Sequence, residues 1–295
     1  MNRVLSTHLF VNHRLTVATL DRIQRAGIPA VEIFCARQHL DYRNSAQMDE
    51  LGHWFRDSEL KLHSLHSPMY TDKIWGRSGP QAVVTITEPV KSKRLPMVDE
   101  IKRAIAVAET VPFRYLIQHI GVGGEAFDEG KIEAAFSALE QLSLFARQRG
   151  VEILLENIPN ELSSAERLMY FVNVTHLDLN FVFDTGHANL LGNAESEFEI
   201  MKNRVRSTHV HDNGGTADSH LFPLVAEGGT IDWKRMMAAF RSREGQYPLL
   251  LELKDPAAAA NTPERPSADR AHVDRANLER AKEVFDRLEN LRNDE

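Results

Sequence analysis

Short apolar runs recur along the whole chain, each bounded by polar or turn-forming residues. Residues 30–35 (AVEIFC), for example, suit a strand that is buried on both faces. The pattern predicts eight strands, at residues 4–10, 30–35, 60–66, 115–120, 151–158, 180–184, 205–211 and 248–253.

Between these runs the apolar positions follow a helical period. In residues 16–26 the apolar side chains of Val17, Leu20 and Ile23 share one face, and Gly27 ends the segment. The same reading predicts helices at residues 16–26, 47–58, 98–109, 129–149, 164–171, 197–202, 231–241 and 277–291.

The alternation of strands and helices determines the expected fold class. It favours an α/β protein with a parallel sheet and outer helices, and eight such units favour a single closed (β/α)8 barrel, the TIM barrel. We find no internal repeat and no domain boundary before Pro256. We therefore expect one domain, with the barrel in residues 1–255, a Pro- and Ala-rich tether in 256–271, and a C-terminal helix in 272–292 that docks on the barrel.

One connection is unusually long. Residues 69–96 are predicted to form a loop with a short strand at 82–86, and loops of this length in compact domains are usually lids or binding loops. Its basic residues Lys91, Lys93 and Arg94 are interpreted as solvated surface. The glycine-rich residues 121–124 match no phosphate-binding motif and are expected to be a flexible turn.

Composition and charge narrow the class of protein. The chain has 295 residues, 42% hydrophobic and 26% charged, which is typical of a globular protein with a substantial core. The formal net charge of −7 disfavours a general nucleic-acid binder. A single cysteine, Cys35, excludes an intrachain disulfide framework, and neither a signal-peptide core nor a membrane span is found. These features lead us to expect a cytoplasmic protein without a membrane partner.

Six consecutive predicted strands end in an imidazole or a carboxylate. In a barrel of this class the chemistry lies at the carboxyl ends of the strands. A charged side chain behind an apolar run is costly unless it is paired or binds a metal. Imidazole nitrogens and carboxylate oxygens together predict a divalent-metal site. The six residues are His66, His119, Glu156, Asp184, His209 and Glu252.

Further candidates lie just beyond two of these ends. His187, Asp218 and His220 could add more ligands. His209 and His211 are two residues apart and face the same side of their strand. We expect His209 to be the inner ligand, because Asp212 marks the strand end, and His211 to contact substrate or a metal ligand.

Five segments of the chain carry a recognisable pattern: LLENIPN, FDTGHAN, THVHDNGGTADSHLFP, EGGTIDW and LLLELK. Together they resemble the xylose isomerase-like TIM barrels, a group of sugar isomerases, sugar epimerases and DNA-repair enzymes of the endonuclease IV type. The similarity runs from about the first strand to the eighth.

The resemblance implies two layers of site residues. Epimerases and isomerases of the group hold one divalent metal, often Mn or Co, at positions matching Glu156, Asp184, His209 and Glu252. The two glutamates also move the proton next to the carbonyl, and the position of His187 touches substrate. The endonuclease IV type adds His66, His119, His187, Asp218 and His220 and holds three zinc ions. This chain has a matching residue at every position of the endonuclease IV type, and not only at the four positions of the epimerases and isomerases.

Our leading expectation is a sugar or sugar-phosphate isomerase or epimerase that depends on one to three ions of Mn, Co or Zn. Glu156 and Glu252 would remove and return a proton next to a carbonyl. His66, His187 and His211 would bind substrate, and Trp75 or Trp233 would cover an apolar sugar face. The partner is then a small carbohydrate, and a homo-oligomer is consistent with the relatives. The alternatives are a zinc-cluster phosphoesterase of the endonuclease IV type, and a barrel that binds a sugar or metal without turnover.

Overall fold

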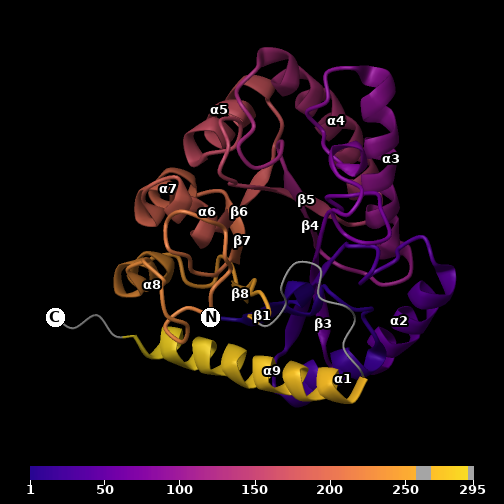
Figure 1. Ribbon diagram of the computed structural model, residues 1–295. Coiled ribbons are helices and arrows are strands. Elements are labelled where there is room, and N and C mark those ends of the chain that lie inside the picture. The colour runs from indigo at the N-terminus through magenta and orange to yellow at the C-terminus, as the bar shows by residue number, and fades with distance from the viewer. Residues whose placement is uncertain (257–266, 292–295) are drawn as a thin grey trace.

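The protein forms a barrel of eight parallel strands surrounded by helices (Figure 1). The computed structural model describes residues 1–256 and 267–291. The strands are β1 (Arg3–Ser6), β2 (Ala30–Phe34), β3 (Lys61–His66), β4 (Tyr115–His119), β5 (Glu152–Glu156), β6 (Asn180–Asp184), β7 (Val205–His209) and β8 (Leu249–Leu251).

The strands follow the order β7-β6-β5-β4-β3-β2-β1-β8, so each one pairs with its neighbours in sequence, and β1 pairs with β8. The seam between β7 and β8 is joined at Val210, which forms a parallel bridge with Leu251. There the Val210 N–H donates to the Leu250 carbonyl at 2.8 Å, and the Glu252 N–H donates to the Val210 carbonyl at 3.2 Å. The predicted (β/α)8 barrel is confirmed.

Helices follow the strands around the ring, and several begin at a side-chain cap. Asp128 accepts the Lys131 N–H at 3.0 Å and Ser164 accepts the Arg167 N–H at 3.3 Å. The helices are α1 (Val17–Arg25), α2 (Ser45–Asp57), α3 (Lys91–Ala106), α4 (Glu129–Arg147), α5 (Ala165–Thr175), α6 (Thr185–Leu190), α7 (Ala194–Met201), α8 (Trp233–Arg241) and α9 (Ser267–Asn290), with 3-10 turns η1 (Thr7–Phe10), η2 (Pro80–Ala82) and η3 (Val107–Glu109).

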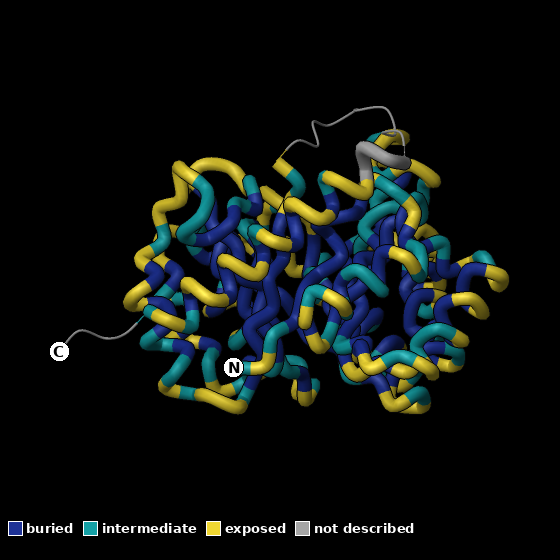
Figure 2. Tube along the Cα trace, turned by 90° about the horizontal axis from the view of Figure 1, so that it is seen from below, coloured by how far each residue is buried: buried dark blue, intermediate teal, exposed yellow. Residues whose placement is uncertain are grey.

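The main apolar core lies between the sheet and the helices. Figure 2 shows the buried chain inside a shell of intermediate and exposed segments. Aromatic side chains from β6, α7 and α8 meet there, because Phe183 and Phe198 lie 5.1 Å apart between ring centroids and Phe198 and Phe240 lie 5.2 Å apart. This packing fixes the strands whose ends carry the polar residues.

The long connection after β3 is partly helical, which differs from the prediction. Helix α3 begins at Lys91 and includes Pro96, whereas we expected a helix only from residue 98. Pro96 is the sixth residue of the helix and lies beyond its first turn, so it removes the helical hydrogen bond to the Ser92 carbonyl. Arg94 is buried and donates to the carbonyls of Glu88 and Pro89, so its interpretation as solvated surface is wrong. The predicted strand at 82–86 is also wrong, since only Val83 forms a bridge, with Tyr70.

Six strands (β1, β2, β4, β5, β7 and β8) end earlier than predicted, β1 by four residues and the others by one or two. β1 stops at Ser6, whose hydroxyl accepts the His8 N–H at 3.3 Å and starts η1. β7 stops at His209. Residues 185–190, for which no helix was predicted, form α6, which is capped by the Asp184 carboxylate.

Helix α9 fills the place of the eighth barrel helix beside α8 and α1 (Figure 1). It begins at Ser267, so residues 267–271 are helical and not part of the tether; residues 257–266 of the expected tether lie outside the described part. Arg22 on α1 pairs with the buried Asp274 at 2.8 Å, and the Arg241 guanidinium donates to the Leu288 carbonyl at 3.2 Å. In residues 1–256 and 267–291, no helix has the length and apolarity needed to cross a bilayer.

Candidate metal centre

The six polar strand ends meet at the mouth of the barrel. Five of them are the last residues of β3 to β7, and Glu252 directly follows β8. Five of the six are buried, and His119 is only slightly exposed. Their grouping with the residues beyond the strand ends defines three sets of side chains.

The central group consists of Glu156, Asp184, His209 and Glu252. One nitrogen or oxygen atom from each residue lies within 4.8 Å of those of the other three. His209 Nδ1 is the hub, at 2.9 Å from Glu156 Oε1, 3.2 Å from Glu252 Oε2 and 3.9 Å from Asp184 Oδ2. His209, rather than His211, therefore occupies the centre of this group.

The second group consists of His66, His119 and Glu156. His119 Nε2 lies 3.0 Å from Glu156 Oε2, and His66 Nε2 lies 3.6 Å from the same oxygen. Glu156 thus presents Oε1 to the central group and Oε2 to the second group. Because its two oxygens face different groups, this carboxylate has the geometry of a bridging ligand.

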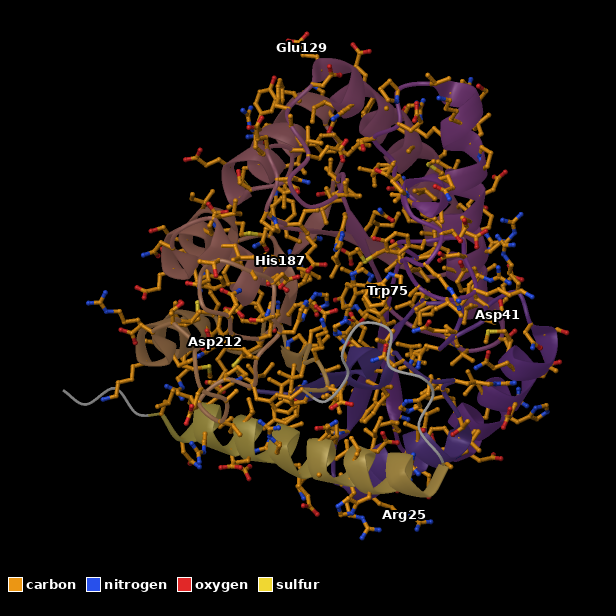
Figure 3. All side chains as sticks on the ribbon, viewed as in Figure 1. Arg25, Asp41, Trp75, Glu129, His187 and Asp212 are labelled. Carbon is orange, nitrogen blue, oxygen red and sulfur yellow. The ribbon has the colours of Figure 1, made fainter. Side chains whose placement is uncertain are left out.

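The outer group consists of His187, His211, Asp218 and His220. Asp218 Oδ2 lies 3.3 Å from His187 Nε2 and 3.2 Å from His220 Nε2. His211 Nε2 lies 3.0 Å from Asp184 Oδ2, which connects this group to the central one. Figure 3 labels His187 inside the ring of helices.

Local hydrogen bonds fix the ends of β5 and β6. Asn157 and Asp184 exchange two bonds, from Asn157 Nδ2 to the Asp184 carbonyl at 2.9 Å and from the Asp184 N–H to Asn157 Oδ1 at 2.8 Å. Asp184 Oδ1 accepts the His187 N–H at 2.6 Å, as the cap of α6. The other oxygen, Oδ2, remains directed at the histidines.

The loop that carries Asp218 and His220 is anchored by Asp212. Its carboxylate accepts the N–H groups of Asn213 at 2.8 Å and Thr230 at 3.0 Å, and the Trp233 indole N–H at 2.6 Å. Trp233 is buried in this anchor, so the expectation that it covers a sugar face is wrong. Trp75 lies inside the ring (Figure 3), with its ring centroid 5.0 Å from that of Phe34.

The electrostatics follow from burying opposite charges together. Burial disfavours the ionised form of Glu156, but the imidazoles of His209 and His119 outweigh it and hold the Glu156 pKa well below its usual range. Burial also opposes the charge on His209, whereas its carboxylate neighbours raise its pKa well above the usual value. For His220, burial is likewise outweighed, mainly by Asp218, and the pKa rises to about 9.

The donor set suits a divalent metal. Buried carboxylates need a cation, and without a metal the protonated imidazoles supply it. A metal ion would replace those protons, because imidazole must be deprotonated to ligate. Nitrogen and oxygen donors are those of Zn, Mn and Co. Each of the three groups could hold a metal ion.

Three residues at or below the mouth were not among the sequence candidates. Phe34 ends β2, and its ring stacks on His66 with centroids 4.4 Å apart. His8 lies 4.8 Å from His220 between ring centroids, and burial lowers its pKa well below the usual value. Glu32 contacts His209. A glutamate inside the apolar run of residues 30–35 was the signal that could have revealed the last one.

The family model described as the xylose isomerase-like TIM barrel matches residues 20–285. The chain belongs to this family. It is 27% identical over 236 residues to the uncharacterized protein MJ1311 of Methanocaldococcus jannaschii, covering 76% of this chain and 74% of that protein.

Two solved structures share the fold over nearly the whole chain. A D-tagatose 3-epimerase-like protein superposes with a TM-score of 0.68 and 21% identity, covering 98% of this chain and 100% of that one. The IolI protein with a bound zinc atom gives a TM-score of 0.74 and 16% identity, covering 98% of each chain.

Proposed function

We propose that the protein is a divalent-metal-dependent isomerase or epimerase of a sugar or sugar phosphate. The observation that carries this proposal is the central group, in which Glu156 at the end of β5 and Glu252 directly after β8 approach the same imidazole nitrogen. The similarity in fold to a D-tagatose 3-epimerase-like protein and to zinc-bound IolI supports it.

The roles of the residues follow from the chemistry of the reaction. Glu156, Asp184, His209 and Glu252 would hold the metal, which supplies polarisation of the substrate's carbonyl and hydroxyl oxygens when bound. A carbon-bound proton next to that carbonyl becomes acidic enough for a carboxylate to remove. His66, His187 and His211 line the same mouth and would orient hydroxyl groups.

Occupancy of the second group decides which glutamate acts as the base. Glu156 has one oxygen in the central group and the other in the second group. If both groups held a metal, the two oxygens of Glu156 would both be engaged as ligands, and Glu252 would be the remaining base. A single base suffices for 1,2-isomerisation, whereas epimerisation through two faces needs both carboxylates.

The full ligand set supports a second candidate, a phosphoesterase with a metal cluster. The specific observation is that the second and outer groups flank the central one and connect to it through Glu156 and Asp184. Several metal ions together can bind the oxygens of a phosphate ester and activate a water. The net charge of −7 favours a small phosphorylated substrate over DNA.

Metal stoichiometry and proton exchange test the two candidates. Elemental analysis of protein purified without chelator is followed by incubation with ketoses and ketose phosphates in deuterated water. For the isomerase we expect deuterium to enter next to the carbonyl, and Glu252→Gln to reduce exchange about 10²- to 10⁴-fold. The exposed Glu109→Gln is the matched control and should keep full exchange.

A different result would favour the phosphoesterase. Close to three zinc ions per chain, with phosphate release and without deuterium uptake, would replace the isomerase by the phosphoesterase. Asp218→Ala and His220→Ala should then abolish hydrolysis, because both residues would hold a metal. Full metal content and activity in both variants would mean that the outer group is not a metal site.

A further inference from the structure

A buried carboxylate, Glu32, lies in the barrel outside the three ligand groups. It is in the middle of β2, is 0% exposed, and is flanked by the apolar residues Val31 and Ile33. A buried charge is costly unless it is paired and hydrogen-bonded. Its partners therefore indicate why a glutamate occupies this position.

Both partners of Glu32 are themselves buried. Its Oε1 and Oε2 lie 3.1 and 3.2 Å from His209 Nε2, across the barrel interior from β2 to β7. The Ser64 hydroxyl on the neighbouring β3 donates to Glu32 Oε2 at 2.8 Å. Glu32 thus contacts His209 on the side away from the central group, because His209 Nδ1 is the atom that faces Glu156 and Glu252.

The two nitrogens of one imidazole are coupled. A neutral imidazole carries a single N–H, so an acceptor at Nε2 keeps the proton there and leaves the lone pair on Nδ1. A carboxylate acceptor also makes the ligating nitrogen more basic and fixes the ring orientation.

Other histidines at the centre use uncharged acceptors. The Nδ1 atoms of His66, His187 and His220 lie 2.9, 3.0 and 2.9 Å from the carbonyl oxygens of Ser67, Asn157 and Glu252. His66 and His220 are oriented at Nδ1 by neutral backbone groups, and His187 Nδ1 also lies 3.4 Å from Glu156 Oε1. His209 Nε2, in contrast, faces the carboxylate of Glu32, which belongs to none of the three groups. The difference sets the central group apart from the other two.

We propose that Glu32 is a positioning residue: it holds His209 in the Nε2–H tautomer with Nδ1 directed at the metal of the central group, and Ser64 holds Glu32. This inference rests on the metal dependence of the proposed function. It predicts that Glu32 raises the metal affinity of the central group specifically, while taking no direct part in ligation.

The test measures metal binding and not turnover. Metal-free protein is titrated with Co²⁺ in competition with a chelating indicator, and the visible absorption of bound Co²⁺ reports the ligand geometry. Glu32→Gln should weaken the tightest Co²⁺ site about 10- to 100-fold and alter its absorption bands, as expected for the loss of a carboxylate behind a ligating histidine. Ser64→Ala should weaken the same site roughly two- to tenfold, because Glu32 keeps its contact with His209.

Glu100→Gln is the matched control. Glu100 is 1% exposed, pairs with Arg43 and Tyr42, and belongs to none of the three ligand groups. This variant therefore also removes a buried carboxylate but should leave Co²⁺ affinity and absorption unchanged. If Glu32→Gln fails to fold, Ser64→Ala carries the test. If wild-type protein binds Co²⁺ and the folded Glu32→Gln variant shows the same affinity and absorption, the role of Glu32 is overturned but the proposed function is not. A wild-type protein that binds no Co²⁺ would overturn both this role and the proposed function.

Discussion

At the scale of single residues, the histidines of the centre pack so closely against the backbone that a side chain larger than glycine would not fit at one position. Gly186, in the first turn of α6, lies directly beneath the His211 ring. A Cβ atom at this position would be 2.0 Å from His211 Cε1 and 2.3 Å from its Nδ1. The neighbouring carbonyl is also engaged, since Asn213 Nδ2 donates to the Gly186 oxygen at 2.8 Å. Glycine is therefore required here by the space left for a ring.

We predict that Gly186→Ala displaces His211 and weakens metal binding in the outer group. Overpacking of a dense site typically costs about 1–3 kcal/mol of unfolding free energy. Denaturant unfolding and elemental analysis measure the two effects. Gly123→Ala is the control, because a Cβ there meets no atom within 4 Å. Equal stability and metal content in both variants would show that the His211 ring can move aside.

At the scale of elements, the loops after the strands are as important as the strand ends. Asp212 and Leu221 bridge the loop that carries Asp218 and His220, and Asp212 also binds the turn that precedes α8. His220 has a positive φ of 45°, which a non-glycine residue adopts only when its surroundings impose it. The anchor at Asp212 therefore fixes the loop that carries Asp218 and His220.

We predict that Asp212→Ala destabilises the protein by roughly 2–4 kcal/mol, because several donors, including the buried Trp233 indole, lose their acceptor. Amide hydrogen exchange should increase over residues 212–231 before it does in the barrel strands. Asp178→Ala provides the comparison, since Asp178 is 96% exposed and forms a surface ion pair with Arg204. Unaltered exchange in the 212–231 loop would rule out Asp212 as its anchor.

At the scale of the whole molecule, the titratable groups of the centre link the stability of the fold to pH. In metal-free protein His187, His209 and His220 have raised pKa values, so they favour the folded state below their unfolded pKa of about 6.5, and this contribution is lost as pH rises through the folded values. Glu156, Asp184 and Asp218 have lowered pKa values, so their contribution is lost when pH falls through the acid range.

We predict that the melting temperature of chelator-treated protein falls between about pH 6.5 and 9. His220, with a folded pKa of about 9, accounts for up to about 3 kcal/mol of the loss. Saturating metal should remove this decline, because the metal takes the place of the protons and binds more tightly as the imidazoles deprotonate. Thermal melts with chelator and with Zn²⁺ at each pH provide the measurement. A gap between the two curves that shrinks as pH rises would contradict the replacement of protons by metal.

The barrel and the set of metal-ligand candidates could be derived from the sequence because both depend on local patterns. Apolar runs that end in His66, His119, Glu156, Asp184 and His209 mark buried strands with polar termini, and the structure ends β3 to β7 at these residues. The nine ligand candidates all lie at the mouth, with His211 as a tenth member.

Only the tertiary structure decided how these residues are divided among three groups. Strand periodicity reports which face of a strand is buried, but not which side chain of another strand lies opposite it inside a barrel. That pairing depends on the tilt and stagger of the closed sheet. For the same reason the sequence could not predict the contact of Glu32 with His209, which joins residues 177 positions apart. The position of α9 could not be derived from the sequence either, because a helix docks according to the gap left by its neighbours and not according to its own sequence alone.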